Sequence, residues 1–509
     1  MLQFKVFDDD GSRACFDLKG AHLLLRDDVA IRGEVTLREG GAAGGRLIRC
    51  RRRGTDPVAL AIIHDAGRMG RLMLHTTLLP DREEPYLLAL ELARQRIKQF
   101  IAKSEEWQMF DLSPEHSAMQ LWEDARQHFT LAINDLDWAS ADRHAKRSLE
   151  AGVDASERLA MAHAEILLHR RFGTRAASST TLGIGVHPGR FEAPQQQLVA
   201  KEADVIVVPL TWRELQVAEK RYDWERTDRL MAWAHGQNKP IVTGPLLEFT
   251  SRALPPWIEV WKHDFDTCRD LVYDHVAKVV ERYRNVVGIW NLAAGLNVNQ
   301  IFPFTADQTI TLLRTAGVLV RQMRRGGRTM VEISHPFGEH TAFNRESIAP
   351  IAWLDQVIQE GLQLDCLGVR IRFGAATPDF AARDLMQVSA ILDRMLPFET
   401  PVMLTGLAVP SASSDEQSSW WHSGWSDRTQ ARWISKLISI ALSKPFVEAV
   451  FWGDLIDRPE LEIPSCGLIT ESGDPKAALA ALVTARRRLR KPIGLLKVAS
   501  RSSLLGEEE

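Results

Sequence analysis

The sequence predicts an α/β fold, a (β/α)8 barrel (TIM barrel) preceded by a β-rich, sandwich-like N-terminal domain and a helical connector. Three observations predict it. The 509 residues are too many for one hydrophobic core, so at least two domains are expected. The first part of the chain holds short apolar runs between turn residues, and a helical periodicity follows them. The remainder alternates eight short β-type runs with helical patterns, which is typical of a closed barrel of parallel strands.

The four expected regions differ in pattern and composition. A small sandwich of strands is expected over residues 1–80, a fold used by carbohydrate-binding modules and by packing or assembly domains alike. The helical connector is expected over 81–175 and the barrel over 178–490. Residues 491–509 form a tail, whose end after Ser500 is expected to be disordered.

The connector shows capping signals and surplus apolar positions. Asp81 and Ser113 are expected to cap helices, and Asp135 and Gly152 to interrupt the helical pattern. The sequence leaves two roles open for residues 81–171: docking of the sandwich onto the barrel, or assembly of a homo-oligomer. The N-terminal domain could mediate that assembly instead. More apolar positions occur than one narrow stripe requires, among them Leu87, Leu88, Ile97, Phe100 and Ile101.

The eight β-type runs mark the strands of the barrel. In this fold the active site lies at the carboxyl ends of the strands, so the residues at those ends carry the functional predictions. The runs begin near Thr181, Asp204, Pro240, Val286, Arg328, Asp365, Pro401 and Val447.

Composition excludes several classes of partner. The formal charge of −3 gives no reason to expect nucleic acid. The five cysteines are far apart and show no metal-ligand spacing, so neither a metal site nor a cofactor is predicted. No membrane segment and no signal peptide are recognised, which favours a cytoplasmic protein.

Four segments in the barrel region resemble one known family. They are RYDWERTDRLMAWAHGQNKPIVTG (221–244), HVAKVVERYRNVVGIW (275–290), FWG (451–453) and DPKAAL (474–479). In order and spacing they resemble glycoside hydrolase family 10, the xylanase family. The resemblance implies a barrel whose fourth and seventh strands end at two catalytic glutamates, an acid and a nucleophile roughly 5 Å apart.

The two catalytic positions of that family hold glycine in this sequence. Gly295 stands at the position of the general acid, in WNLAAGL, and Gly406 stands at the position of the nucleophile, in TGLA. A glycine side chain offers neither a proton nor a lone pair, so the family mechanism is predicted to be lost. The expected function is that of a pseudoenzyme, a non-hydrolytic carbohydrate-binding or scaffold protein.

Relocated carboxylates leave a second function open, that of a divergent intracellular glycosidase. A pair of acids across the mouth could supply a new acid and base. Arg370 and Arg372 on the sixth strand offer another explanation, ion pairing with Glu332 on the fifth. The candidate acids are Glu248, Glu332, Glu339, Asp454 and Asp457.

A glycan is the expected ligand under either function. Tryptophan offers sugars a flat apolar face and an indole N–H, although it is also a common core residue. The residues predicted to bind it are Trp212, Trp290, Asn291, Trp421 and Trp452.

Overall fold

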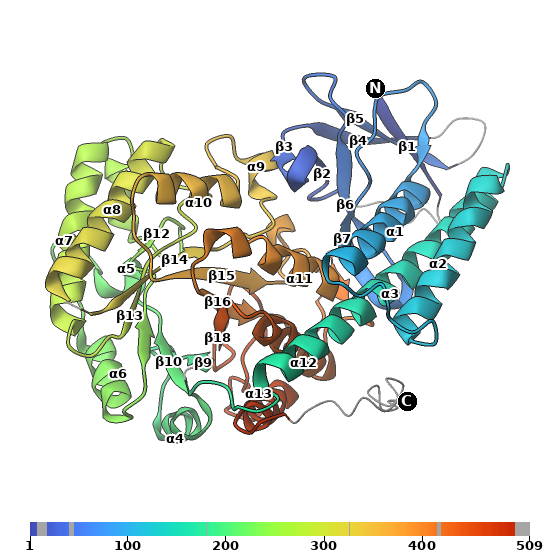
Figure 1. Ribbon diagram of the computed structural model, residues 1–509. Coiled ribbons are helices and arrows are strands. Elements are labelled where there is room, and N and C mark those ends of the chain that lie inside the picture. Colours follow the sequence, from blue (N-terminus) through green and yellow to red (C-terminus); the bar gives the residue numbers. More distant parts are fainter. Residues whose placement is uncertain (8–17, 40–44, 180, 325, 415–418, 494–509) are drawn as a thin grey trace.

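The computed structural model describes residues 1–7, 18–39, 45–179, 181–324, 326–414 and 419–493. The barrel lies beside the N-terminal strands, and the long helix α3 (Trp138–Phe172) runs from those strands to the barrel (Figure 1). The part of the tail after Ser500 lies outside the described residues.

Eight parallel strands close into a barrel, which confirms the predicted (β/α)8 fold. β18 pairs with β9, and β11 pairs with β13, so the ring has no open edge. The strands are β9 (Leu182–Gly185), β10 (Val205–Val208), β11 (Ile241–Thr243), β13 (Ile289–Ala294), β14 (Arg328–Ile333), β15 (Cys366–Arg372), β16 (Val402–Ala408) and β18 (Val447–Trp452). A short strand, β12 (Leu247–Glu248), also pairs with β13.

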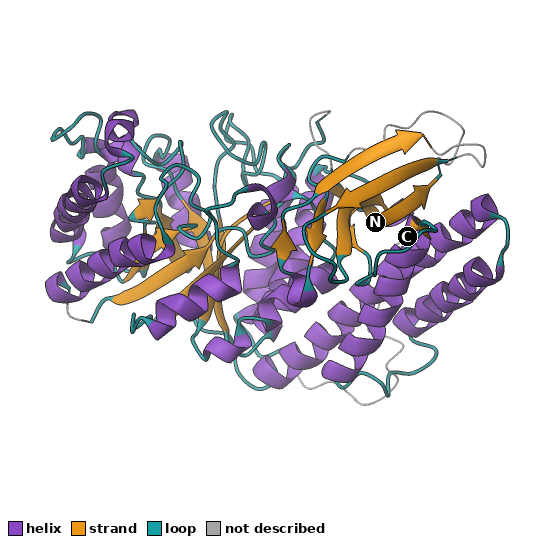
Figure 2. Ribbon diagram, turned by 90° about the horizontal axis from the view of Figure 1, so that it is seen from above, coloured by secondary structure: helices purple, strands orange, loops and turns teal. Residues whose placement is uncertain are grey.

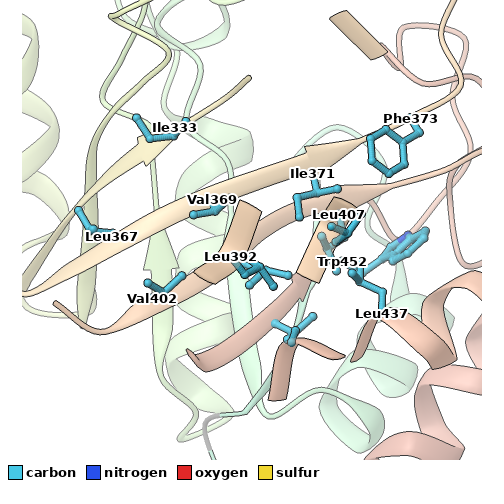
Figure 3. Packing of buried hydrophobic residues seen from close by; sticks show 14 of the residues in the cluster. Ile333, Leu367, Val369, Ile371, Phe373, Leu392, Val402, Leu407, Leu437 and Trp452 are labelled. Carbon is cyan, nitrogen blue, oxygen red and sulfur yellow. The ribbon is translucent and has the colours of Figure 1, made fainter. Parts of the chain in front are cut away.

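Helices surround the strands because the connections carry amphipathic patterns. They are α4 (Ala193–Glu202), α5 (Trp212–Leu215), α6 (Glu225–Gly236), α7 (Phe265–Tyr283), α8 (Ala306–Met323), α9 (His340–Phe343), α10 (Pro350–Gln359), α11 (Leu385–Asp393), α12 (Asp427–Ser443) and α13 (Ala477–Leu489). Val369 and Ile371 of β15 belong to the large apolar cluster that includes Leu392 of α11 (Figure 3). Within the described part of the chain, none of the helices has the length and apolar character needed to cross a membrane.

A second, smaller cluster fills the barrel itself. Its side chains come from strands around the ring and touch one another, so they must lie inside it. They are Val205, Val242, Met330, Cys366, Met403, Ala449 and Phe451, with Val207 and Ile289 packed against them. The interior is therefore a packed apolar layer, above which the polar residues of the mouth lie.

Two sheets form the N-terminal region and confirm its β-rich character. One has the order β4 (Glu34–Glu39), β5 (Arg46–Arg51), β1 (Leu2–Val6) and β8 (Tyr86–Leu87). The other has the order β17 (Trp420–Trp421), β7 (Gly70–His75), β6 (Ala59–Asp65), β2 (His22–Leu24) and β3 (Ala30–Ile31). Buried residues of both sheets belong to the same large apolar cluster as residues of the barrel.

The strand β17 comes from the barrel, not from the N-terminal region. It lies in the connection between β16 and α12, and it pairs antiparallel with β7 through Trp420 opposite Arg71 and Trp421 opposite Gly70. Gly70 has a φ of 100°, and a Cβ there would lie 2.4 Å from the Trp420 carbonyl oxygen. Glycine is therefore required for this close approach. One sheet is thus assembled from both ends of the chain.

Two of the expected helix starts were wrong. Helix α1 (Leu88–Glu106) does not begin at Asp81, because the residues before it form strand β8, which pairs with β1 in parallel. The Asp81 carboxylate pairs with Arg52 at 2.8 Å. Helix α2 (Ser117–Asn134) begins after Ser113, because the ring nitrogen of His116 accepts the Ala118 N–H at 3.2 Å and so caps the helix instead.

The expected break at Gly152 was also wrong. Helix α3 (Trp138–Phe172) runs through it, and a Cβ at Gly152 would lie 2.9 Å from Cγ of Arg96 on α1. The glycine therefore allows two helices to pack closely.

Leu88 and Phe100 are buried within the chain, whereas Ile101 is 45% exposed. Self-association through this region stays a prediction. The connector helices lie along the N-terminal sheets (Figure 2).

Candidate active site at the mouth of the barrel

The alternation of side chains along the strands places charged residues just above the apolar layer. Met330 and Cys366 belong to that layer, so Glu332 and Arg370, two and four residues further on, also face the interior. Gly368 of β15 lies opposite Glu332 of β14, and a Cβ there would lie 3.0 Å from Cβ of Glu332. The small residue therefore leaves room for the carboxylate.

Arg370 joins two of the predicted carboxylates. Its guanidinium forms an ion pair with Glu248 at 2.8 Å and another with Glu332, which confirms the expected pairing on the fifth and sixth strands. Asn291 donates from Nδ2 to Glu332 at 2.9 Å. Burial alone would lower the pKa of Arg370, but Glu248, Glu332 and Glu462 outweigh it and raise the pKa. The arginine is therefore a permanent cation at the centre of the mouth.

Arg372 makes the corresponding contacts above Gly406. It donates from Nε to the Gly406 carbonyl oxygen at 3.0 Å and pairs with Glu462 at 2.7 Å. Burial would raise the pKa of Glu462, but Arg372 and Arg370 outweigh it and lower the pKa. Sequence reasoning missed Glu462, because it lies in the long connection after β18 with no motif around it. At the position predicted for a nucleophile, the structure thus has an arginine and its counter-ion.

Both glycines adopt a backbone conformation that side chains disfavour. The φ angle is 62° at Gly295 and 57° at Gly406. A Cβ would lie 2.9 Å from Oγ of Ser334 in the first case and 3.1 Å from Nη2 of Arg372 in the second. A glutamate at either position would meet backbone strain and an occupied neighbourhood.

We expect Gly406→Ala to lower the free energy of unfolding by about 1–2 kcal/mol, because an L-residue is strained at this φ. Chemical denaturation of the purified variant measures it. Gly236→Ala is the matched control, because Gly236 ends helix α6 and a Cβ there meets nothing within 4 Å. That change is expected to be neutral or stabilising by up to about 1 kcal/mol. Equal stability of the wild type and Gly406→Ala would contradict the prediction.

The other three predicted carboxylates are also paired with cations. Asp454 pairs with Arg458 at 2.8 Å, and Asp457 pairs with Lys476 at 2.5 Å. Glu339 pairs with Arg383 in a buried position. Burial raises the pKa of Glu339 despite the arginine. The structure thus brings together only Glu248 and Glu332, and it does so through an arginine.

Asp379 is an acid that sequence reasoning missed. It lies in a 3-10 helix (Pro378–Phe380) after β15, and burial, together with the negative charges of Glu339 and Glu462, raises its pKa to about 6. A carboxyl group with such a pKa suits proton transfer near neutral pH. No sequence signal marks it, because the shift arises from residues brought close by folding.

Little space remains between the first and eighth strand ends. A pocket of about 10 Å³, lined by His187, Arg190, Asp454 and Arg458 among others, has room for roughly one water. Beside it, Nε2 of His187 lies within hydrogen-bonding distance of Oε1 of Glu214, at 2.9 Å. Among the residues that the structure describes, no three His, Cys, Asp or Glu are grouped so as to hold a metal ion.

The tryptophans predicted to bind a glycan are buried. Trp290 and Trp452 alternate with interior residues and so face outward, toward the surrounding helices, with 0% and 1% exposure. Trp212 stacks on His275 with ring centroids 4.3 Å apart, and Trp421 lies in the N-terminal sheet. Their role in ligand binding, and that of the buried Asn291, stays a prediction.

Two other tryptophans in the mouth loops keep part of their rings exposed. Trp257 and Trp261 lie in a 3-10 helix (Pro256–Trp261) that follows β11 and β12, on the side of the strands' carboxyl ends. The indole of Trp257 donates to the Gln216 carbonyl oxygen at 3.3 Å. No sequence signal marks either tryptophan, because neither follows a strand end directly.

Comparison with known proteins agrees with this architecture. Residues 173–304 match the model of the family described as Glycosyl hydrolase family 10. The matched residues cover the first half of the barrel. The match includes Gly295 and ends before β14, so Arg370 and Gly406 lie outside it. A comparison with curated proteins gives no significant match.

Solved structures similar to this chain include several xylanases and a family 10 protein. Xylanase 10B from Thermotoga maritima is 13% identical, with 63% of this chain and 97% of that chain covered and a TM-score of 0.47. Xylanase B from Clostridium stercorarium F9 is 14% identical, with 62% and 98% covered and a TM-score of 0.46. The family 10 protein from Paenibacillus barcinonensis is 15% identical, with 60% and 94% covered and a TM-score of 0.46.

Proposed function

We propose that this protein is a non-hydrolytic, glycan-binding or scaffold protein built on a family 10-like barrel. The observation that carries the proposal is the arginine pair at the mouth. Arg370 and Arg372 bind the carboxylates that could have served as a new acid and base. A carboxylate held by an arginine is a poor proton donor, because the cation stabilises its ionised form.

A glycan ligand is proposed because the family-10-like region suggests one and the rim offers partly exposed rings. Trp257 and Trp261 lie where a sugar at the mouth could stack on an indole face. A glycan array with the purified chain identifies the ligand, and Trp261→Ala is expected to weaken that binding. Exposed Tyr273 on α7 serves as the control, because Tyr273→Ala changes an aromatic residue outside the mouth loops.

We expect no release of aryl alcohol from an aryl β-xylobioside and no new reducing ends from xylan. Without an acid and a nucleophile, the roughly 10²–10⁴-fold contribution of general acid catalysis and the covalent route are both absent. A family 10 xylanase assayed in parallel is the positive control. Turnover that co-purifies with the chain through two chromatographic steps would sink the proposal.

The second candidate function, a glycosidase with relocated carboxylates, is favoured by Asp379. Its pKa of about 6 is that of a usable general acid, and Glu462 is among the groups that raise it. If turnover appears, Asp379→Asn should abolish it, and the wild-type pH profile should show an ionisation near pH 6. Separate amide variants then test the remaining acids, which are Glu248, Glu332, Glu339, Asp454, Asp457 and Glu462.

A further inference from the structure

A cavity of about 110 Å³ lies where the N-terminal sheet meets the barrel. Its walls come from β2, β6 and β7 of that sheet, from α1 and α11, and from the connections after β14 and β15, which supply Phe337 and Arg383. Leu24, Met73, Ile391 and Phe337 give it a mostly apolar lining. An apolar cavity of roughly 150 Å³ is large enough to bind benzene, so this one suits a compact body of similar or slightly smaller size.

Arg383 lines the cavity, and some of its N–H donors have no hydrogen-bond partner in the part of the chain that the structure describes. The side chain of Arg383 is 6% exposed, and among the described residues its Nε and Nη1 have no hydrogen-bond partner. Only Nη2 is used, in the ion pair with Glu339. The guanidinium lies 4.7 Å from the centroid of the Phe337 ring. A buried guanidinium with unused donors is costly, and an anion would satisfy them.

The other polar groups of the lining do not cancel this preference. Arg394 adds a second cation, and Asp28, the carboxylate of the lining, is exposed. His22 and His75 also line the cavity, and burial lowers the pKa of each, to about 4 for His22, so both are neutral at pH 7. Because Arg383 is already paired with Glu339, the distinguishing feature of the lining is an apolar floor beside guanidinium donors that lack partners among the described residues.

We propose that this cavity binds a small organic monocarboxylate with a compact apolar body. The carboxylate accepts hydrogen bonds from Arg383, and the body packs against Phe337, Met73 and Ile391. Because the walls belong to both the N-terminal sheet and the barrel, the bound anion stabilises their contact. The cavity lining shares no residue with the Arg370 cluster, and this proposal does not rest on the function proposed for the mouth.

Three probes of similar shape test the charge preference. We expect benzoate to bind and to raise the Tm, benzyl alcohol to bind about tenfold more weakly or worse, and benzylamine not to bind. Titration calorimetry and thermal shifts on the full chain measure this. Equal binding of benzoate and benzyl alcohol, or no binding of benzoate at millimolar concentration, overturns the proposal.

Two kinds of variant test the location. Ala390→Leu fills the cavity from α11 without touching the ion pair, so it should abolish benzoate binding. Ala481→Leu is the matched control, because Ala481 is a half-buried alanine on α13 outside the lining, and it should leave binding unchanged. The double change Arg383→Gln with Glu339→Gln removes both charges, and benzoate should then bind no better than benzyl alcohol. Binding that survives Ala390→Leu places the site elsewhere.

Discussion

Replacement of Arg370 by leucine is expected to lower the free energy of unfolding by about 3–5 kcal/mol. The reason is the pair of carboxylates that it holds. Glu332 and Glu248 have side chains only 4% and 17% exposed, so without the arginine two negative charges remain inside the barrel. Urea denaturation at pH 7 measures the loss.

Two controls separate charge from packing. Arg314→Leu removes an exposed pair with Glu360, whose side chains are 45% and 54% exposed, and should cost less than about 1 kcal/mol. Combining Arg370→Leu with Glu248→Gln and Glu332→Gln should restore much of the stability, because no unpaired charge then remains. A loss below about 1 kcal/mol for Arg370→Leu alone would contradict the buried network.

Glu157→Ala is expected to lower the free energy of unfolding by about 3 kcal/mol or more, because Glu157 of α3 is the buried partner of groups in two other segments of the chain. It accepts from Nε1 of Trp421 at 2.6 Å and from the Leu385 N–H at 3.1 Å, and it pairs with His422 at 2.8 Å. Glu150→Gln is the matched control on the same helix, because Glu150 makes an exposed pair with Arg68 and should change little.

The pH dependence of this effect has a definite sign. Burial would raise the pKa of Glu157, but His422, Trp421 and the Leu385 N–H outweigh it and lower the pKa below 4.5. A carboxyl group with a depressed pKa in the folded state stabilises it above its unfolded pKa, and the contribution fades as the pH falls through the folded value. The stability difference between wild type and Glu157→Gln should therefore be largest near neutral pH and shrink below about pH 4.5. A constant difference between pH 7 and pH 3 would contradict this.

Local patterns in the sequence were sufficient for the barrel but not for its contacts. The eight strands follow from apolar runs at regular spacing, and the Arg370–Glu332 pair from neighbouring strands. The outward orientation of Trp290 and Trp452 follows from alternation once the register is known, and the sequence alone did not fix that register. A position near a strand end was therefore a poor guide to whether the ring faces the mouth of the barrel.

Contacts between segments far apart in the chain could not be predicted from the sequence. Strand β17 has two residues and pairs with residues some 350 positions earlier, so no periodicity marks it. Arg96 of α1 likewise pairs with a residue far along the chain, Asp384, at 2.6 Å. The raised pKa of Asp379 depends on burial and on two acids from other loops. These features arise from tertiary packing, which local propensity does not encode.

The two-residue strand β17 makes the chain resistant to being cut into parts. A barrel excised without the N-terminal sheet would lose the partner of Trp421, which is 0% exposed, and would present its indole and neighbouring apolar atoms to water. The N-terminal sheet alone would lose an edge strand and expose a row of unpaired backbone groups. We therefore expect the full chain to unfold in one cooperative transition, and the function of each part is better mapped with point variants of the full chain than with fragments.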